Sequence, residues 1–120
     1  MKNIAIILAA GSGTRLGSSK PKQFIKLNKK ELLAYSLDTF SSCSKIDEIV
    51  LVINKNYEDD YLKIISHYKF SKISKLVIGG ATRQQSVKNA IKYLSKNNDE
   101  AVVLVHDAAR PFVSEKIIPD

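Results

Sequence analysis

Continuous apolar runs without polar alternation recur along this chain, and segments with helical periodicity lie between them. Ile4–Leu8 and Ile49–Ile53 are such runs, and strands that are buried on both faces have this character. The stretch 58–68 instead carries apolar residues at i, i+3, i+4 and i+7, which is the spacing of an amphipathic helix. This alternation predicts an α/β fold, in which a mostly parallel sheet is flanked by helices.

The other elements are predicted from the same patterns. Strands are expected at 3–9, 24–27, 48–53, 73–78 and 101–105, and helices at 31–40, at 58–68, from 82 onward and from 115 onward. Thr82 and Gln85 have the spacing of a capping box at the start of the third helix, and Ser114 is the expected cap of the last. Residues 1–120 form one predicted domain. Ligands are expected at the carboxyl ends of its parallel strands.

The chain is basic, but its charge is not concentrated in one place. Lys and Arg number 19 against 12 Asp and Glu, so the formal net charge is +7. Most of the basic residues are lysines spread along the whole chain, without interleaved aromatic residues for base stacking, so nucleic acid is not an expected partner. The longest apolar run, Ile4–Ala10, is far shorter than the ~18–20 residues of a membrane span. A lone cysteine, Cys43, fits a reducing compartment, so the expected location is cytoplasmic, without a membrane partner.

The glycines and arginines cluster in three short segments, each beside the end of a predicted strand. The glycines are Gly11, Gly13, Gly17, Gly79 and Gly80, and the arginines are Arg15, Arg83 and Arg110. Glycine lets a ligand approach the backbone closely, and the guanidinium group offers a fork of donors that fits phosphate. Because the carboxyl ends of parallel strands meet at one edge of a sheet, the chemistry is predicted to lie at that edge.

The first segment, 10–21, is a Gly- and Ser-rich loop that follows a buried strand. Its backbone N–H groups, together with the charges of Arg15 and Lys22, suit a triphosphate. A dinucleotide-binding fingerprint is disfavoured, because the third glycine comes one residue too late and Asn54 stands where an acidic residue would hold the ribose. A P-loop is disfavoured because no glycine precedes a lysine. The plainer interpretation is a flexible connection with solvated charges.

The other two segments add a helix N-terminus and a carboxylate. Segment 79–87 leads into a helix whose free N–H groups favour anions, and Ser86 in its first turn could hydrogen-bond a base or ribose. Asp107 is a natural ligand for Mg²⁺ that bridges phosphate oxygens. The plainer interpretations are helix capping by Thr82, a turn role for Asp107 and a salt bridge from Asp107 to Arg110. His106 is expected to be structural.

In order and spacing, these segments resemble the 2-C-methyl-D-erythritol 4-phosphate cytidylyltransferases, a family of nucleotidyltransferases. The matching segments are Leu8-Ala9-Ala10-Gly11-Ser12-Gly13-Thr14-Arg15, Pro21-Lys22-Gln23-Phe24, Gly79-Gly80 with Arg83 and Ser86-Val87, and Val105-His106-Asp107-Ala108-Ala109-Arg110-Pro111-Phe112. The resemblance implies a Rossmann-like fold of the nucleotide-diphospho-sugar transferase type. It implies an enzyme that transfers the cytidylyl group of CTP to 2-C-methyl-D-erythritol 4-phosphate and releases pyrophosphate, in isoprenoid biosynthesis by the non-mevalonate pathway.

The resemblance also implies roles at the matching positions. Arg15 and Lys22 would be catalytic and would stabilise charge on the α-phosphate. Asp107 would hold Mg²⁺ or another divalent cation, and Arg110 would border the acceptor. The nucleotide would be contacted by Ala9, Ala10, Gly11, Ser12, Gly13, Gly80, Ala81, Ser86 and Ala108. Position 81 is alanine where some relatives carry a polar residue, so a contact there would use the backbone.

The length departs from the family's pattern. The 120 residues correspond to about the first half of the family's usual chain, so the chain is expected to be truncated and inactive by itself, and the full-length protein is expected to be a homodimer. The alternatives are a ribitol-5-phosphate cytidylyltransferase of cell-wall or capsule synthesis, a non-catalytic CTP-binding fragment and a Rossmann-type oxidoreductase. Ala108-Ala109 favours the methylerythritol branch by resemblance.

Overall fold

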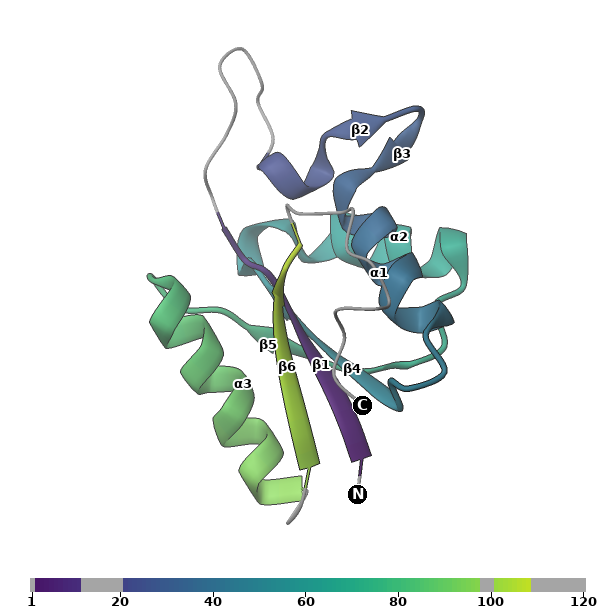
Figure 1. The fold of residues 1–120 in the computed structure, drawn as a ribbon. Helices are drawn as coiled ribbons and strands as arrows, with labels where there is room; N and C mark the ends of the chain where they lie inside the picture. Colours follow the sequence, from purple (N-terminus) through teal and green to yellow (C-terminus); the bar gives the residue numbers. More distant parts are fainter. Residues whose placement is uncertain (1, 12–20, 98–100, 109–120) are drawn as a thin grey trace.

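The computed structural model describes residues 2–11, 21–97 and 101–108 (Figure 1). Within them, four parallel strands form the main sheet in the order β5-β4-β1-β6. These strands are β1 (Lys2–Ala9), β4 (Glu48–Ile53), β5 (Ile73–Ile78) and β6 (Ala101–Asp107). The helices are α1 (Leu32–Ser42), α2 (Glu58–Tyr68) and α3 (Arg83–Asn97), with short 3₁₀ helices η1 (Lys22–Phe24) and η2 (Lys55–Tyr57). The predicted α/β class with a parallel sheet is confirmed.

Successive residues of the central strands face opposite sides of the sheet, and both sides are apolar. Odd-numbered residues such as Ile7 and Leu51 pack against α1 and α2. Even-numbered residues such as Ile6 and Val52 pack under α3, against Ala90 and Leu94. Figure 1 shows the resulting three layers, with α3 on one side of the sheet and α1 and α2 on the other. Burial on both faces is the reason that these strands lack polar alternation.

The strand order places a topological switch at the carboxyl end of β1. The chain moves from β1 to β4 and β5 on one side and then returns to β6 on the other side of β1. In the β1–β6 pairing, Leu8 lies beside Asp107, and the Ala108 N–H continues the contact by donating to the Leu8 carbonyl at 2.9 Å. Ligands of open α/β sheets bind at such a switch point. The end of β1 and the end of β6 are thereby brought together.

The predicted strand at 24–27 is partly wrong. Lys22–Phe24 forms η1, and only Lys26–Leu27 (β2) pairs with Lys30–Glu31 (β3) in a small antiparallel hairpin. The turn residues Asn28 and Lys29 both have positive φ, 53° and 67°, as a type I′ turn requires. Phe24 is drawn into the core against the ring of Tyr61, at 4.9 Å between centroids, and this tertiary contact overrides the local preference for a strand.

Two other expectations need adjustment. Strand β6 continues to Asp107, two residues beyond the predicted end, because its pairing with β1 continues to Leu8. Thr82 caps α3 by accepting the Gln85 N–H at 3.1 Å, which is one half of the capping box, and the Gln85 side-chain nitrogen donates to Asn89 Oδ1. The predicted helix from 115, with its cap Ser114, lies outside the described residues. Among the helices that the structure describes, none is long and apolar enough to cross a membrane.

Candidate functional site

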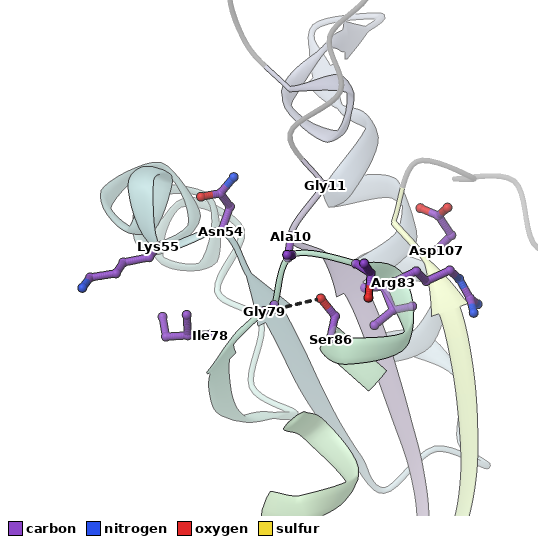
Figure 2. Close-up of a pocket in the computed structure, with 13 residues that line it drawn as sticks. Ala10, Gly11, Asn54, Lys55, Ile78, Gly79, Arg83, Ser86 and Asp107 are labelled. Atoms are coloured by element: carbon purple, nitrogen blue, oxygen red, sulfur yellow. Dashed lines mark hydrogen bonds between the residues drawn. The ribbon is translucent and has the colours of Figure 1, made fainter. Parts of the chain in front are cut away.

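A cavity of about 360 Å³ opens at the carboxyl edge of the main sheet, on the side covered by α3 (Figure 2). The ends of all four strands contribute to it, together with the loop between β5 and α3 and the first turn of α3. Its described lining consists of Leu8, Ala10, Gly11, Asn54, Lys55, Ile78, Gly79, Gly80, Ala81, Thr82, Arg83, Ser86 and Asp107. The predicted clustering of the strand ends at one edge is therefore present in the fold.

Gly79 forms a close-packed part of the cavity wall. Its N–H donates to the Ile53 carbonyl at 2.8 Å, which holds the loop against the end of β4. A Cβ atom at this position would lie 2.4 Å from Ala10 Cβ and 2.8 Å from Ser86 Oγ, closer than real Cβ atoms come. Because glycine has no Cβ, the loop after β5 can touch the end of β1 here.

Ser86 supplies a buried polar group to the same wall. Its hydroxyl oxygen accepts the Gly80 N–H at 3.1 Å, the dashed contact in Figure 2, and its side chain is almost fully buried. A serine hydroxyl that accepts one hydrogen bond still has its own proton to donate. Ala10, Gly11, Gly80, Ala81 and Ser86, which were predicted to contact the nucleotide, all line this one cavity.

The charges around the cavity suit an anion that carries a divalent cation. Arg83 begins α3 and Lys55 begins η2, and both side chains are exposed. Asp107 is the one carboxylate among the described lining residues, and Figure 2 shows it on the same side of the cavity as Arg83. The first turn of α3 adds the partial positive charge and the free N–H groups of a helix N-terminus.

Asp107 and His106 are separated by the alternation of β6. Asp107 is exposed at the cavity, whereas His106 faces the α1 side of the sheet. The His106 ring lies 5.0 Å from the Phe40 ring, and its Nε2 is 3.5 Å from Ser36 Oγ. These contacts support the structural interpretation of His106.

Three predicted site residues do not line the cavity. Ala9 faces the α1 and α2 side, and its carbonyl accepts hydrogen bonds from Gln23 and Tyr61. Ala108 is fully buried, with its carbonyl accepting from Ser36 Oγ at 3.1 Å. Lys22 is exposed on η1. Their assigned roles stay predictions, as do those of Ser12, Gly13, Arg15 and Arg110, which lie outside the described residues.

Sequence reasoning missed some of the lining. The sequence patterns used Asn54 only as an argument against a dinucleotide site, and they assigned no individual role to Lys55 or to Arg83, which belongs to a matching segment. All three line the cavity, as do Gly79 and Thr82. The available signal was position: Asn54 and Lys55 directly follow β4, and Arg83 opens α3 directly after the loop that ends β5.

The fold and the cavity define a class, namely Rossmann-like α/β domains with a glycine-lined polar site at the switch point of a parallel sheet. The chain belongs to the IspD family, described as 2-C-methyl-D-erythritol 4-phosphate cytidylyltransferase, whose model matches residues 3–120. The resemblance expected from the sequence motifs is thereby confirmed.

Individual relatives agree with the family match. The chain is 50% identical over 117 residues to a 2-C-methyl-D-erythritol 4-phosphate cytidylyltransferase of Clostridium botulinum (strain Loch Maree / Type A3), covering 98% of this chain and 50% of that protein. It is 47% identical over 120 residues to the protein of the same name from Clostridium perfringens (strain SM101 / Type A), covering 99% of this chain and 52% of the relative. The chain thus spans about half the length of the curated relatives that it matches.

Solved structures also match this chain over part of their own length. The crystal structure of the 4-diphosphocytidyl-2C-methyl-D-erythritol synthase of Anaerococcus prevotii superposes with a TM-score of 0.78 at 39% identity, covering 97% of this chain and 47% of that one. The bifunctional IspDF of Campylobacter jejuni superposes with a TM-score of 0.72 at 32% identity, covering 98% of this chain and 28% of that one. The described sheet therefore has the arrangement found in solved members of the family.

Proposed function

We propose that the full-length protein transfers the cytidylyl group of CTP to 2-C-methyl-D-erythritol 4-phosphate and releases pyrophosphate. The observation that carries this proposal is the cavity itself. It lies at the switch point of an IspD-family fold and joins the glycines Gly79 and Gly80, a helix N-terminus and, among the described residues, one carboxylate. In this proposal residues 1–120 are one nucleotide-binding domain.

The nucleotide has a natural place in this cavity. The backbone of Ala10, Gly11 and Gly80 gives close access to a ligand, and Ala81 can contribute only backbone donors and acceptors. The Ser86 hydroxyl can donate to a base or ribose from the cavity wall. Lys55 and Arg83 add cationic charge at the rim that favours a triphosphate over a neutral ligand.

A divalent cation fits the donors that are present. Mg²⁺ commonly takes one or two carboxylates and fills its other positions with water and substrate phosphate oxygens. Asp107, exposed at the cavity, provides such a carboxylate. The described residues contain no group of three or more His, Cys, Asp or Glu that could hold a metal, and water and substrate phosphate oxygens would fill the positions that Asp107 leaves open. When bound, the cation would supply neutralisation of phosphate charge.

The residues of this chain would then position the reactants and neutralise charge. An oxygen of the acceptor phosphate attacks the α-phosphorus of CTP, the bond from that phosphorus to the α–β bridging oxygen breaks, and pyrophosphate leaves. Such a displacement needs alignment and charge stabilisation more than proton transfer. We assign charge stabilisation at the α-phosphate to Arg15 and Lys22, and contact with the acceptor to Arg110. A cytoplasmic location and a homodimeric full-length protein belong to the same proposal.

Ligand binding by the 120-residue chain tests the nucleotide half of the proposal. CTP, UTP, ATP and NAD should be titrated with and without Mg²⁺ at moderate salt, because a protein of net charge +7 holds any polyanion weakly at low ionic strength. We expect selective binding of CTP that Mg²⁺ strengthens. Equal binding of all four ligands, or a preference for NAD, would contradict the assignment.

Turnover by the full-length protein tests the acceptor. Pyrophosphate release should depend on CTP and on 2-C-methyl-D-erythritol 4-phosphate, and ribitol 5-phosphate should not replace that acceptor. Release with ribitol 5-phosphate alone would favour the cell-wall branch instead. CTP binding without release by any form of the protein would favour a non-catalytic CTP-binding role.

Replacing Lys22 with Met is expected to lower pyrophosphate release by about 10²-fold, as removal of one charge contact to a transition state does. The fold should be unaffected, because the Lys22 side chain is exposed. Lys26→Met is the matched control, since Lys26 is equally charged and exposed and lies on β2. Steady-state rates of pyrophosphate release and melting temperatures are measured for both variants. Equal rates for the two would show that Lys22 is not a catalytic residue.

A further inference from the structure

The carboxyl ends of β1 and β4 meet at a buried tyrosine hydroxyl. Tyr61 of α2 is fully buried, and its hydroxyl accepts the Asn54 N–H at 3.1 Å and donates to the Ala9 carbonyl. Ala9 is the last residue of β1, and Asn54 directly follows β4. The hydroxyl therefore bridges a donor and an acceptor of the two strands at the point where their pairing stops.

A buried glutamine, Gln23, completes this junction. Gln23 of η1 is almost fully buried, and its Nε2 donates to the Ala9 carbonyl at 2.6 Å and to the Gly11 carbonyl at 3.0 Å. A longer contact of 3.3 Å joins the same nitrogen to the Tyr61 hydroxyl. Because two of the partners are carbonyls, only the amide nitrogen can face them.

We propose that Gln23 and Tyr61 are positioning residues that orient the first residues of the glycine-rich loop for nucleotide binding. The inference rests on the proposed CTP site, and what it adds is the device that sets the geometry of that site. Neither side chain is among the described residues that line the cavity, so both act through the backbone of Ala9 and Gly11.

The physical reason is the planarity of the peptide unit. In a trans peptide the carbonyl and the following N–H point in opposite directions, so holding the Ala9 carbonyl on the α2 side directs the Ala10 N–H away from it. Ala10 and Gly11 line the cavity on the α3 side of the sheet. Because the backbone of Ala10 and Gly11 is held in this way, it loses less conformational entropy when it binds a ligand, which favours affinity.

The Tyr61 hydroxyl can hold the junction by fixed hydrogen bonds, without a change in its protonation or orientation. Burial raises the pKa of Tyr61, so its hydroxyl keeps the proton that it donates to Ala9 through the neutral range. The Phe24 ring packs on the Tyr61 ring at 4.9 Å, which fixes the orientation of the phenol. A phenylalanine at position 61 would keep this packing and lose only the hydroxyl.

The test compares two hydroxyl deletions on the same helix. Tyr61→Phe removes the bridge between the strand ends, and Tyr68→Phe removes a hydroxyl that donates to Glu31 Oε1 at 2.9 Å, away from the cavity. Gln23→Met is a second variant of the junction that keeps side-chain length and removes both donors. Hydrogen exchange of residues 8–11 and the Kd for CTP with Mg²⁺ are measured for each variant of the full-length protein.

We expect faster exchange at 8–11 and a Kd for CTP raised about tenfold in Tyr61→Phe and in Gln23→Met. Tyr68→Phe should leave the exchange at 8–11 and the Kd for CTP unchanged, even if its melting temperature falls as much as those of the two junction variants. Unchanged exchange at 8–11, a Kd within twofold of that of the unaltered protein, or an equal loss of affinity in Tyr68→Phe would each overturn the proposal. An unaltered protein that fails to bind CTP would count against the proposed function, and the exchange result would still decide whether the junction orders the loop.

Discussion

Replacing Asp107 with Asn is expected to reduce pyrophosphate release by about 10²–10³-fold, the loss found when one preorganised electrostatic contact to a transition state is removed. The amide has nearly the size of the carboxylate but no charge, so it is a poorer ligand for a hard cation. In the proposed site Asp107 is the one carboxylate among the described lining residues, so no second carboxylate there can replace it as a ligand for the cation. The apparent affinity for Mg²⁺ during turnover should fall as well.

The fold should survive this substitution. The Asp107 side chain is exposed, and the residue is held by backbone pairing beside Leu8. Asp59→Asn is the matched control, because it makes the same change of charge at an exposed position in the first turn of α2. Rates measured across a Mg²⁺ titration should separate the two variants. If Asp107→Asn kept its rate and its Mg²⁺ dependence, the assigned metal role would be wrong.

Replacing Gly79 with Ala is expected to destabilise the protein by about 1–3 kcal/mol, the usual cost of inserting a methyl group into a close-packed site. The new Cβ would meet Ala10 Cβ at 2.4 Å, Ser86 Oγ at 2.8 Å and Val52 Cγ1 at 3.2 Å. Ala10 Cβ is attached directly to the backbone, so the loop itself must move to relieve the contact. Because this loop forms the cavity wall, the affinity for CTP should fall together with stability.

Gly11→Ala is the matched control for this effect on stability. Among the described residues other than its chain neighbours, no atom lies within 4 Å of the position that a Cβ would take at Gly11, and its φ lies outside the left-handed region, so the same added methyl group has room. Urea denaturation of both variants gives the comparison, and we expect a change below about 0.5 kcal/mol for Gly11→Ala. Equal stability of the two variants would show that the close approach at Gly79 does not constrain the loop.

The regular elements were predictable because their patterns are local. The bounds of β4, α2 and β5 agree with those predicted. The apolar run 49–53 is typical of a strand covered on both faces, and the i, i+3, i+4, i+7 spacing in 58–68 places Tyr61 and Ile64 toward the core. Gly79-Gly80 also correctly marked the end of β5.

Residues 22–31 show where local patterns were insufficient. Nothing in the order Lys22-Gln23-Phe24 distinguishes a 3₁₀ turn from a strand. The outcome depends on Phe24 packing against Tyr57 and Tyr61, whose rings come from η2 and α2. Lys29 adopts a positive φ in the hairpin turn although it lacks the turn preference of glycine or asparagine.

The sequence by itself determined the α/β class, the family and part of the cavity lining, because glycine clusters and apolar runs are visible without knowing what they contact. Only the tertiary structure decided that Ala10 rather than Ala9 faces the cavity, and the same geometry separates Asp107, which was predicted for the site, from His106, which was predicted to be structural. Both outcomes depend on which residues of β1 and β6 point toward the face of the sheet that α3 covers. The order and register of strands that are far apart in the chain determine which residues point to that face, so local spacing alone does not predict them.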